Sequence, residues 1–501
     1  MIGSEFTRTP GMARRLILDT CHRGAPIVRR TALGAAALVA AACSGTGIAA
    51  SSASTDAAPP AIAAVSPTST VSGASTASRT GANWPEYDGN AARTGVAAGV
   101  PRAGTLTTAW IARLDGAVYG QPLVVGNEVI AATENDSVYA LNRATGKVIW
   151  GKHLGTPVPK PPPNGCGNIY PLGITGTPIY DASNGLVYAV AEIAGYHHML
   201  VALNATTGAV KLDRYLDLPT STNQPAFNQQ RPGLAIDDGR VYATFGGLAG
   251  DCGAYQGSVV SAPLTGNGPL TSWRTPTTRE GAIWAPGGPV VGPDGNLWVS
   301  IGNGAAESGN YDGSDSVTEL SPSLRRLAYF APSTWAQDNA NDLDLGSTMP
   351  VLAPGNTVFI IGKRGVGYLL NGTHLGGIGG QLAEQNVCNA FGTAAVSGST
   401  VYEPCREGGG MAAIVVSAAN KTIKVLWRGP ANAQGTPVIG GGAVWVTDYN
   451  GDTLYELNQG TGKVEHRISI GQSLPHFSSL SLSGGTAYVS TLTGVTAING
   501  A

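Results

Sequence analysis

Residues 120–155 read GQPLVVGNEVIAATENDSVYALNRATGKVIWGKHLG, and the rest of the chain repeats this unit in weaker form. The unit holds four short apolar runs, separated by turn residues such as Gly126-Asn127 and Thr145-Gly146. The runs begin at Pro122, Val129, Val138 and Lys147. Short strands separated by such turns form one twisted antiparallel sheet. The runs are apolar throughout, which is typical of a sheet that packs between two neighbours and is not stable alone.

Seven further copies of the unit follow. We expect them at residues 174–217, 229–276, 283–335, 342–388, 389–430, 435–471 and 476–500. The last copy has only three strand signals, and the segment Leu106 to Leu114, LTTAWIARL, can supply the fourth because it carries Trp110 but follows no other strand. Joining the two ends closes a ring and removes exposed sheet edges. The sequence therefore predicts an all-β protein, an eight-bladed β-propeller of four-stranded antiparallel blades over residues 81–501, closed by an N-terminal strand.

Composition agrees with this prediction and excludes one class of partner. The 501 residues include 71 Gly and 32 Pro, and only 12% are charged, which is typical of a turn-rich all-β chain. A closed repeat of this length forms one domain. The net charge is -2 and the chain has no basic block, so we expect no nucleic-acid partner, because phosphate binding needs clustered Lys and Arg.

The first 43 residues are predicted to be an export signal. Arg29-Arg30 precede the apolar run Thr31 to Ala42, which is too short to span a bilayer and loosely resembles a twin-arginine signal. Cys43 resembles a bacterial lipoprotein processing site and would give a membrane tether; the alternative is simple cleavage near Ala49-Ala50. We therefore expect an exported bacterial protein, either extracellular or anchored at the cell surface.

Two other N-terminal features do not contribute to the fold. Residues 1–11 contain Gly3-Ser4-Glu5-Phe6, which is typical of a cloning scar and would make Met12 the natural start. Residues 44–80 are almost wholly Ala, Ser, Thr, Pro and Gly, a composition that cannot bury a core and predicts a disordered linker.

Four cysteines remain after the export signal, and they are Cys166, Cys252, Cys388 and Cys405. An even number in an exported chain, with no C-x-x-C pair, predicts two disulfides instead of zinc or covalent haem. Cys388 and Cys405 are near each other in the sequence, so we expect them to pair. This pairing leaves Cys166 with Cys252.

The repeat VYALNRATGKVIW resembles a family of known propellers. It matches the A-x-D-x-x-T-G-x-x-x-W pattern of the PQQ-binding-like (quinoprotein alcohol dehydrogenase-like) repeats, whose Trp wedges between blades, and WPEYDGNAARTG from Trp84 resembles the lead-in segment of the same family. Some members are dehydrogenases that carry pyrroloquinoline quinone (PQQ), and others are outer-membrane assembly lipoproteins that bind protein partners. The resemblance thus implies either an exported PQQ-dependent dehydrogenase of an alcohol-type substrate or a non-catalytic propeller scaffold, such as a binding lipoprotein at the cell surface.

The resemblance also implies a metal site and an aromatic floor for the quinone. Glu192, in AEIAGYHHMLVALN, resembles the metal-binding Glu of the dehydrogenases; the alternative is a solvated Glu in a loop, where we also expect His197-His198. Trp284 precedes APGGPVVGPDGNLWVSIGNG at the place of the Trp on which the quinone stacks, and Asn303 matches a metal-ligating Asn. The alternative for these two is an interblade Trp and a turn Asn. Oxygen ligands of this kind favour calcium.

Catalytic residues are implied by two further matches. Asp342 and Asp344, in NDLDLGSTMPVL, resemble the W-D-x-D segment whose first Asp is the catalytic base, although Asn341 replaces the Trp. Lys363, in GKRGVGYLLN, matches a Lys that contacts the quinone oxygens; the alternative is a surface Lys in a turn. The substrate would be a small or polymeric alcohol, and the hydride would pass to the quinone. We expect an external electron acceptor, because the chain has no haem motif, and a monomer.

Overall fold

The computed structural model describes residues 82–160, 166–218, 224–406 and 409–500. The predicted export signal of residues 1–43, with Cys43, and the predicted linker of residues 44–80 lie outside the described residues. Within the described ranges no helix is both long and apolar enough to cross a membrane.

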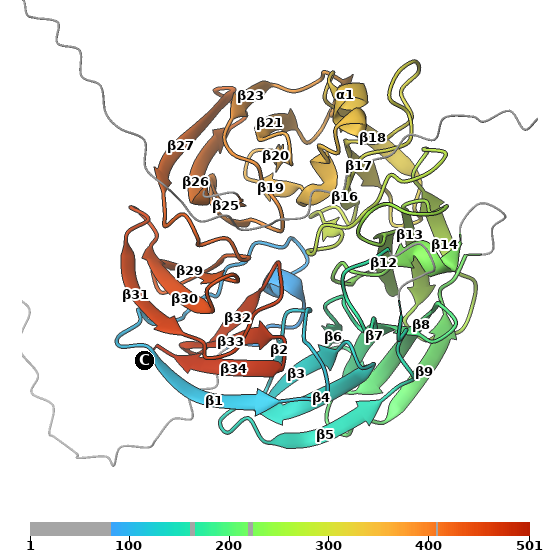
Figure 1. The fold of residues 1–501 in the computed structure, drawn as a ribbon. Coiled ribbons are helices and arrows are strands. Elements are labelled where there is room, and N and C mark those ends of the chain that lie inside the picture. Colours follow the sequence, from blue (N-terminus) through green and yellow to red (C-terminus); the bar gives the residue numbers. More distant parts are fainter. Residues whose placement is uncertain (1–81, 161–165, 219–223, 407–408, 501) are drawn as a thin grey trace, which may run out of the picture. The chain divides into compact units, whose positions relative to one another are not determined.

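The described strands gather into eight antiparallel sheets, which follow one another around a central axis as the blades of a propeller (Figure 1). The predicted eight-bladed β-propeller is therefore confirmed. The first strands of neighbouring blades contact one another, as β2 contacts β6 and β32. The first strands of blades one to four are β2 (Leu123–Val125), β6 (Ile179–Asp181), β11 (Ala235–Asp237) and β15 (Val290–Val291). Those of blades five to eight are β19 (Val351–Ala353), β24 (Ala395–Ser397), β28 (Val438–Gly440) and β32 (Leu480–Ser483).

The remaining strands complete each blade in chain order. Blades one to four continue with β3 (Glu128–Thr133), β4 (Ser137–Asn142), β5 (Val148–His153), β7 (Leu186–Ile193), β8 (His197–Asn204), β9 (Val210–Tyr215), β12 (Arg240–Gly247), β13 (Ser258–Pro263), β14 (Thr271–Arg274), β16 (Leu297–Ile301), β17 (Ser316–Leu320) and β18 (Arg326–Ala331). Blades five to eight continue with β20 (Thr357–Ile361), β21 (Val366–Asn371), β23 (Ala383–Asn386), β25 (Thr400–Cys405), β26 (Gly410–Ser417), β27 (Thr422–Arg428), β29 (Ala443–Asp448), β30 (Thr453–Asn458), β31 (Val464–Ser469), β33 (Thr486–Thr491) and β34 (Gly494–Asn499).

A few elements lie outside this four-strand pattern. Two short strands extend blades three and four: β10 (Asn228–Gln229) pairs with β12, and β22 (Gly377–Ile378) pairs in parallel with β18. The helical elements of the described residues are all short. They are η1 (Tyr87–Gly89), η2 (Pro225–Phe227), α1 (Trp335–Ala340) and η3 (Leu345–Ser347).

The ring closes through the N-terminal strand, as predicted. Strand β1 (Thr107–Arg113) pairs antiparallel with β34, from Thr107 opposite Asn499 to Arg113 opposite Gly494. Figure 1 shows the blue β1 beside the red β34. Blade eight therefore combines the two ends of the fold, and neither end presents an unpaired edge at this junction.

Tryptophans of outer strands fasten each of three blades to the next. Trp150 of β5 donates its Nε1–H to the Ala205 carbonyl oxygen at 2.8 Å, and its ring covers Gly208, whose φ is +68°. A Cβ at Gly208 would lie 2.6 Å from the indole, so both backbone freedom and space require glycine here. The same arrangement joins Trp110 to Arg143 and Gly146, and Trp427 to Gln459 and Gly462.

The lead-in segment crosses the axis of the ring before β1 begins. The Tyr87 hydroxyl lies 3.0 Å from the Thr393 hydroxyl and 2.9 Å from that of Thr436, in blades six and seven. The Arg93 guanidinium donates to the Leu234 carbonyl oxygen of blade three at 2.7 Å. Contacts with blades on different sides of the axis place this blue segment at the centre of Figure 1.

Candidate cofactor site

A cavity of about 450 Å³ lies at the end of the ring where the second strands of the blades finish. Among its wall residues are Arg231, Trp284, Asn303, Asp342, Asp344, Lys363, Phe391, Arg406, His476 and Phe477. Five of the six predicted site residues therefore meet in one cavity, and Glu192 is not among its wall residues.

Two kinds of position in the repeat supply these side chains. Asn303, Lys363 and Arg406 each follow the second strand of a blade, namely β16, β20 and β25. Trp284 and Phe391 instead precede first strands, β15 and β24. Because every blade has the same strand order, equivalent positions meet at the same end of the ring although they are far apart in the sequence.

Lys363 forms ion pairs with both predicted catalytic aspartates. Its Nζ lies 2.6 Å from Asp342 Oδ1 and also contacts Asp344 Oδ2. The Asn303 backbone N–H donates to Asp344 Oδ1 at 2.6 Å, so Asp344 is held from two sides. The Asp344 side chain is only 4% exposed, whereas that of Asp342 is 63% exposed. Asp344 is therefore fixed within the wall, and Asp342 is accessible at its edge.

The pKa values of the two aspartates move in opposite directions. Partial burial by the surrounding loops and the nearby Asp344 charge raise the pKa of Asp342 to about 6, although Lys363 opposes the shift. Burial tends to raise the pKa of Asp344 as well, but Lys363 and the Asn303 N–H outweigh it and hold this pKa below its ordinary value. Burial tends to lower the pKa of Lys363, and the two aspartates together raise it instead. The pair thus holds one permanent carboxylate and one group that titrates near neutral pH.

Three aromatic rings line the wall beside this ion-pair network. The ring centroid of Trp284 lies 6.3 Å from that of Phe391 and 6.1 Å from that of Phe477. Lys363 Nζ lies 5.7 Å from the Trp284 centroid and 5.6 Å from that of Phe391, within the range of a cation–π interaction. Trp284 is half-buried, so part of its indole is available to a ligand. Flat apolar walls with a cation at their edge suit a flat, electron-poor ring system.

Two arginines add positive charge to the same cavity. Arg231 lies over the Phe477 ring, with its Cζ 5.5 Å from the centroid, and Arg406 lies over Phe391 at 4.4 Å. Arg231 Nη1 also lies 3.2 Å from His476 Nε2. Burial and the two guanidinium charges lower the pKa of His476 to about 3, so this imidazole is neutral and can accept from Arg231. Neither arginine forms an ion pair with a carboxylate of the described residues, which leaves both able to bind an anionic ligand.

Glu192 has a different environment from the one predicted. It is 2% exposed and its Oε2 lies 3.5 Å from His198 Nε2, while Asp217 Oδ1 lies 2.9 Å from His198 Nδ1. Burial tends to lower the pKa of His198, but the two carboxylates raise it to about 10, so the imidazole is protonated at neutral pH. The expectation of a surface loop for His197-His198 is therefore wrong. Both residues lie at the start of β8, where His198 is buried and His197 is exposed.

The acidic residues near the cavity are already engaged with cationic side chains. Glu192 is paired with a protonated imidazole, and it does not reach the cavity wall that contains Asn303. Asp342 and Asp344 are already paired with Lys363. In the described ranges, no three or more His, Cys, Asp or Glu side chains are grouped to hold a metal ion. The prediction that Glu192 and Asn303 share a calcium ion stays a prediction, and the structure does not place both residues in the wall of this cavity.

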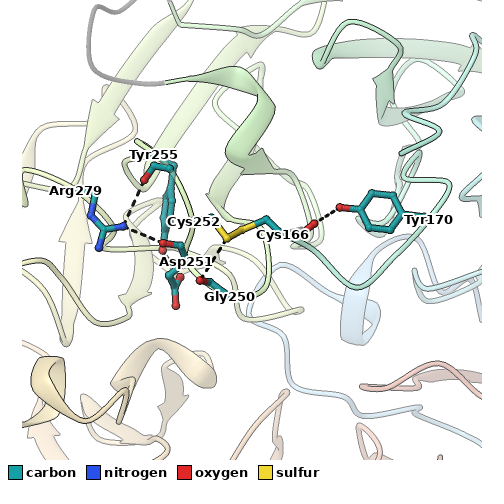
Figure 2. The surroundings of a disulfide bond; sticks show 8 residues. Cys166, Tyr170, Gly250, Asp251, Cys252, Tyr255 and Arg279 are labelled. Carbon is teal, nitrogen blue, oxygen red and sulfur yellow. Dashed lines mark hydrogen bonds between the residues drawn. A yellow bond between two sulfur atoms is a disulfide. The ribbon is translucent and has the colours of Figure 1, made fainter. Parts of the chain in front are cut away.

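Both predicted disulfides are present, and both lie next to the cavity. Cys166 pairs with Cys252, and Cys388 with Cys405. Figure 2 shows the first of them, which joins the segment that contains Tyr170 to the Gly250-Asp251 turn. Gly250 and Asp251 are wall residues, and Arg406 directly follows Cys405. The crosslinks therefore anchor loops that shape the cavity.

The sequence did not reveal several wall residues, but one signal could have found some of them. Arg231 and Phe391 each lie four positions before a first strand, which begins at Ala235 in blade three and at Ala395 in blade six. Tyr119 has the same position before Leu123 in blade one and lines a small hollow that also contains Arg231. Aligning the blades at their first strands would thus have marked this position as facing the axis.

Comparison with known proteins agrees with the repeat and the fold. A family model of PQQ-like repeats, described as outer membrane protein assembly factor BamB, matches residues 101–301. This range covers β1, blades one to three and the first half of blade four, and the remaining sheets repeat the same strand order. The chain is an eight-bladed β-propeller whose repeats resemble the PQQ-like family. None of the curated proteins compared with it matches.

Solved structures similar to this propeller include two dehydrogenases and BamB. Quinohemoprotein alcohol dehydrogenase ADHIIG from Pseudomonas putida HK5 has a TM-score of 0.63 and 12% identity, over 83% of this chain and 80% of that one. A europium-containing methanol dehydrogenase has a TM-score of 0.59 and 14% identity, over 82% and 89%. BamB from Moraxella catarrhalis has a TM-score of 0.53 and 16% identity, over 79% and 97%. At these identities the likeness shows the fold alone, so the function must be argued from the cavity.

Proposed function

We propose that this PQQ-like propeller is an exported PQQ-dependent dehydrogenase that oxidises a small or polymeric alcohol and passes the electrons to an external acceptor. The observation that carries the proposal is the meeting of Trp284, Lys363 and Asp342 in one cavity. These residues come from two blades and were singled out separately in the sequence. A scaffold without a cofactor has no need to gather an indole, an ammonium and a titratable carboxylate.

The cavity suits the shape and charge of PQQ, a flat ortho-quinone with three carboxylates. Trp284 offers an aromatic face, and Arg231 and Arg406 offer guanidinium groups without carboxylate partners among the described residues. Charge-assisted hydrogen bonds between guanidinium and carboxylate are among the stronger polar contacts in proteins. We therefore assign Trp284 to stacking and the two arginines to the carboxylates.

Asp342 is assigned the role of the base. Its pKa of about 6 keeps it ionised at neutral pH, and its exposed side chain can accept the substrate hydroxyl proton and release it to solvent. When bound, the quinone supplies the acceptor for the hydride that leaves the substrate carbon. Lys363 places a fixed positive charge beside the reacting groups, and Asp344 together with Asn303 holds that ammonium in position.

A non-catalytic scaffold, for example a binding lipoprotein at the cell surface, is the second candidate. The family model described as an outer membrane assembly factor and the likeness to BamB favour it. In that case the protein would bind a partner through its outer surface. Under either proposal the chain acts outside the cytoplasm as a monomer, free or tethered through Cys43, and binds no nucleic acid.

An assay of dye reduction distinguishes the dehydrogenase from the non-catalytic scaffold. Purified protein mixed with PQQ and an artificial acceptor should reduce the dye when an alcohol from a panel of primary, secondary and polymeric alcohols is added. Calcium should be included in one arm and replaced by EDTA in another. Failure with every alcohol in both arms, together with no quinone binding, would favour the scaffold.

A further inference from the structure

The Lys363 ammonium lies between two carboxylates. A metal ion bound by the same carboxylates would need that position. Lys363 Nζ contacts Asp342 and Asp344 at once, and the lysine side chain is only 15% exposed. The two aspartates precede the first strand of blade five, and Lys363 follows the second strand of the same blade. Because β19 and β20 are antiparallel neighbours, the three groups are brought together by a single sheet.

The oxygen atoms near this ammonium are engaged with other partners and are not available to calcium while Lys363 is in place. Calcium takes six to eight oxygen ligands at about 2.3–2.6 Å. Here Asp342 and Asp344 are paired with Lys363, and Asp344 Oδ1 also accepts the Asn303 N–H. The carboxylate of Glu192, which would be a further donor, is paired with His198 instead.

The charges of the wall also balance without a metal ion. Three cationic side chains, Arg231, Lys363 and Arg406, face three acidic ones, Asp251, Asp342 and Asp344. A divalent cation would add two positive charges in a partly buried space, next to an ammonium that cannot move away without breaking two ion pairs. Such an addition is unfavourable unless new anionic ligands accompany the ion.

We propose that this cavity excludes divalent cations, because the Lys363 ammonium already occupies the place between Asp342 and Asp344 that such a cation would need. The exclusion does not depend on any cofactor. The further consequence, that Lys363 supplies the positive charge beside the quinone, rests on the proposed function.

The test measures binding of calcium alone, without quinone. Full-length protein freed of metal with EDTA is titrated with calcium chloride by isothermal calorimetry, and melting curves are recorded with and without calcium. The wild type is compared with Lys363→Met, which removes the ammonium, and with Lys363→Met/Asp344→Asn, which also removes a carboxylate. Arg364→Met is the matched control, because Arg364 is the next residue and pairs with Asp338 rather than with an acidic residue of the cavity wall.

In the wild type, any calcium site that involves Asn303 or Asp344 should have a Kd of no less than about 1 mM. Lys363→Met should bind one calcium ion at least about ten-fold more tightly than Arg364→Met and should melt at a higher temperature when calcium is added. The double variant should lose this gain. Lys363→Gln replaces the Met variant if the latter does not fold.

Two results would overturn the inference. One is a wild-type calcium site that Asn303→Ala or Asp344→Asn weakens. The other is a folded Lys363→Met protein that binds calcium no better than Arg364→Met, since the ammonium would then not be what takes the cation's place. Neither result depends on whether PQQ binds, so a failure here is distinct from a failure of the proposed function.

Discussion

Lys363 Nζ and Asp342 Oδ1 lie 2.6 Å apart at the edge of the cavity. The two residues are 21 positions apart in the chain, and the antiparallel pair β19 and β20 brings them to the same end of blade five. The lysine is the more buried partner and is also held by Asp344. This relation leaves Asp342 as the accessible member of the group, as the proposed base must be.

Asp342→Asn should abolish alcohol-dependent dye reduction and leave PQQ affinity nearly unchanged. The amide has almost the same shape but cannot accept the substrate proton. Steady-state rates and a binding titration on the same preparation check this. Equal rates for the variant and the wild type would show that Asp342 is not the base.

The rate of the wild type should rise with pH through about 6 and then level off. Asp342 must be ionised to act, and its pKa is raised to about 6, so the active fraction grows as pH increases through that value. The profile of kcat/KM between about pH 4 and 8 reports this pKa for the free enzyme. A rate that falls over this range would contradict the assignment.

Trp284→Ala should weaken PQQ binding by about 1–3 kcal/mol, because stacking and apolar contact are lost. Trp150→Ala is the matched control, since it also removes an indole but at a blade junction. The control should lower the melting temperature and leave the affinity unchanged. Calorimetric titration of both variants with PQQ measures the two affinities. Equal losses of affinity would show that Trp284 has no special contact with the quinone.

Gly208→Ala should destabilise the fold more than Gly239→Ala. Both glycines have almost the same φ, +68° and +69°, so the backbone strain of a Cβ is alike. A Cβ at Gly208 would strike the Trp150 ring at 2.6 Å, whereas nothing lies within 4 Å at Gly239. The difference in unfolding free energy should be about 1–3 kcal/mol. Equal stabilities in denaturant melts would refute the role given to the tryptophan wedge.

His198→Gln should cost about 3 kcal/mol of stability at neutral pH, because it leaves the buried Glu192 carboxylate without its cation and removes one of the two partners of Asp217. The folded-state pKa of His198 is about 10, above the ordinary value of 6.5. Its stabilisation is therefore fully present below about pH 6.5 and is lost as pH rises through about 10. The gap between the melting curves of wild type and variant should narrow over that range. His197→Gln, at the exposed neighbour that also pairs with Asp217, should change stability by less than about 1 kcal/mol.

The fold was predictable because the blade unit occurs eight times in the sequence. Turn signals and apolar runs mark each blade, and the orphan strand with Trp110 marks the closure. The cavity was only partly predictable. Trp284, Asn303 and Lys363 lie in motifs that resemble a known family, but Arg406 comes from a loop with no such motif, and only the ring geometry brings it to the same wall.

Glu192 shows a second limit of the sequence. Its motif implied a metal ligand. A carboxylate can also pair with a cationic side chain that the fold places beside it. Here the pairing of β7 with β8 sets Glu192 directly opposite His198. That register depends on the length of the turn between the strands and is not visible in the motif. The chemistry of a predicted ligand therefore has to be read together with its cross-strand partner.

Direct titration with PQQ tests the central claim most sharply. Calorimetry with full-length protein, in EDTA and without alcohol, should give one quinone per chain, and Arg231→Gln, Trp284→Ala and Lys363→Met should each weaken binding while His197→Gln does not. The wild type binding one PQQ under these conditions is the result the account predicts. No binding with or without added calcium, or binding that none of the cavity variants weakens, would contradict it.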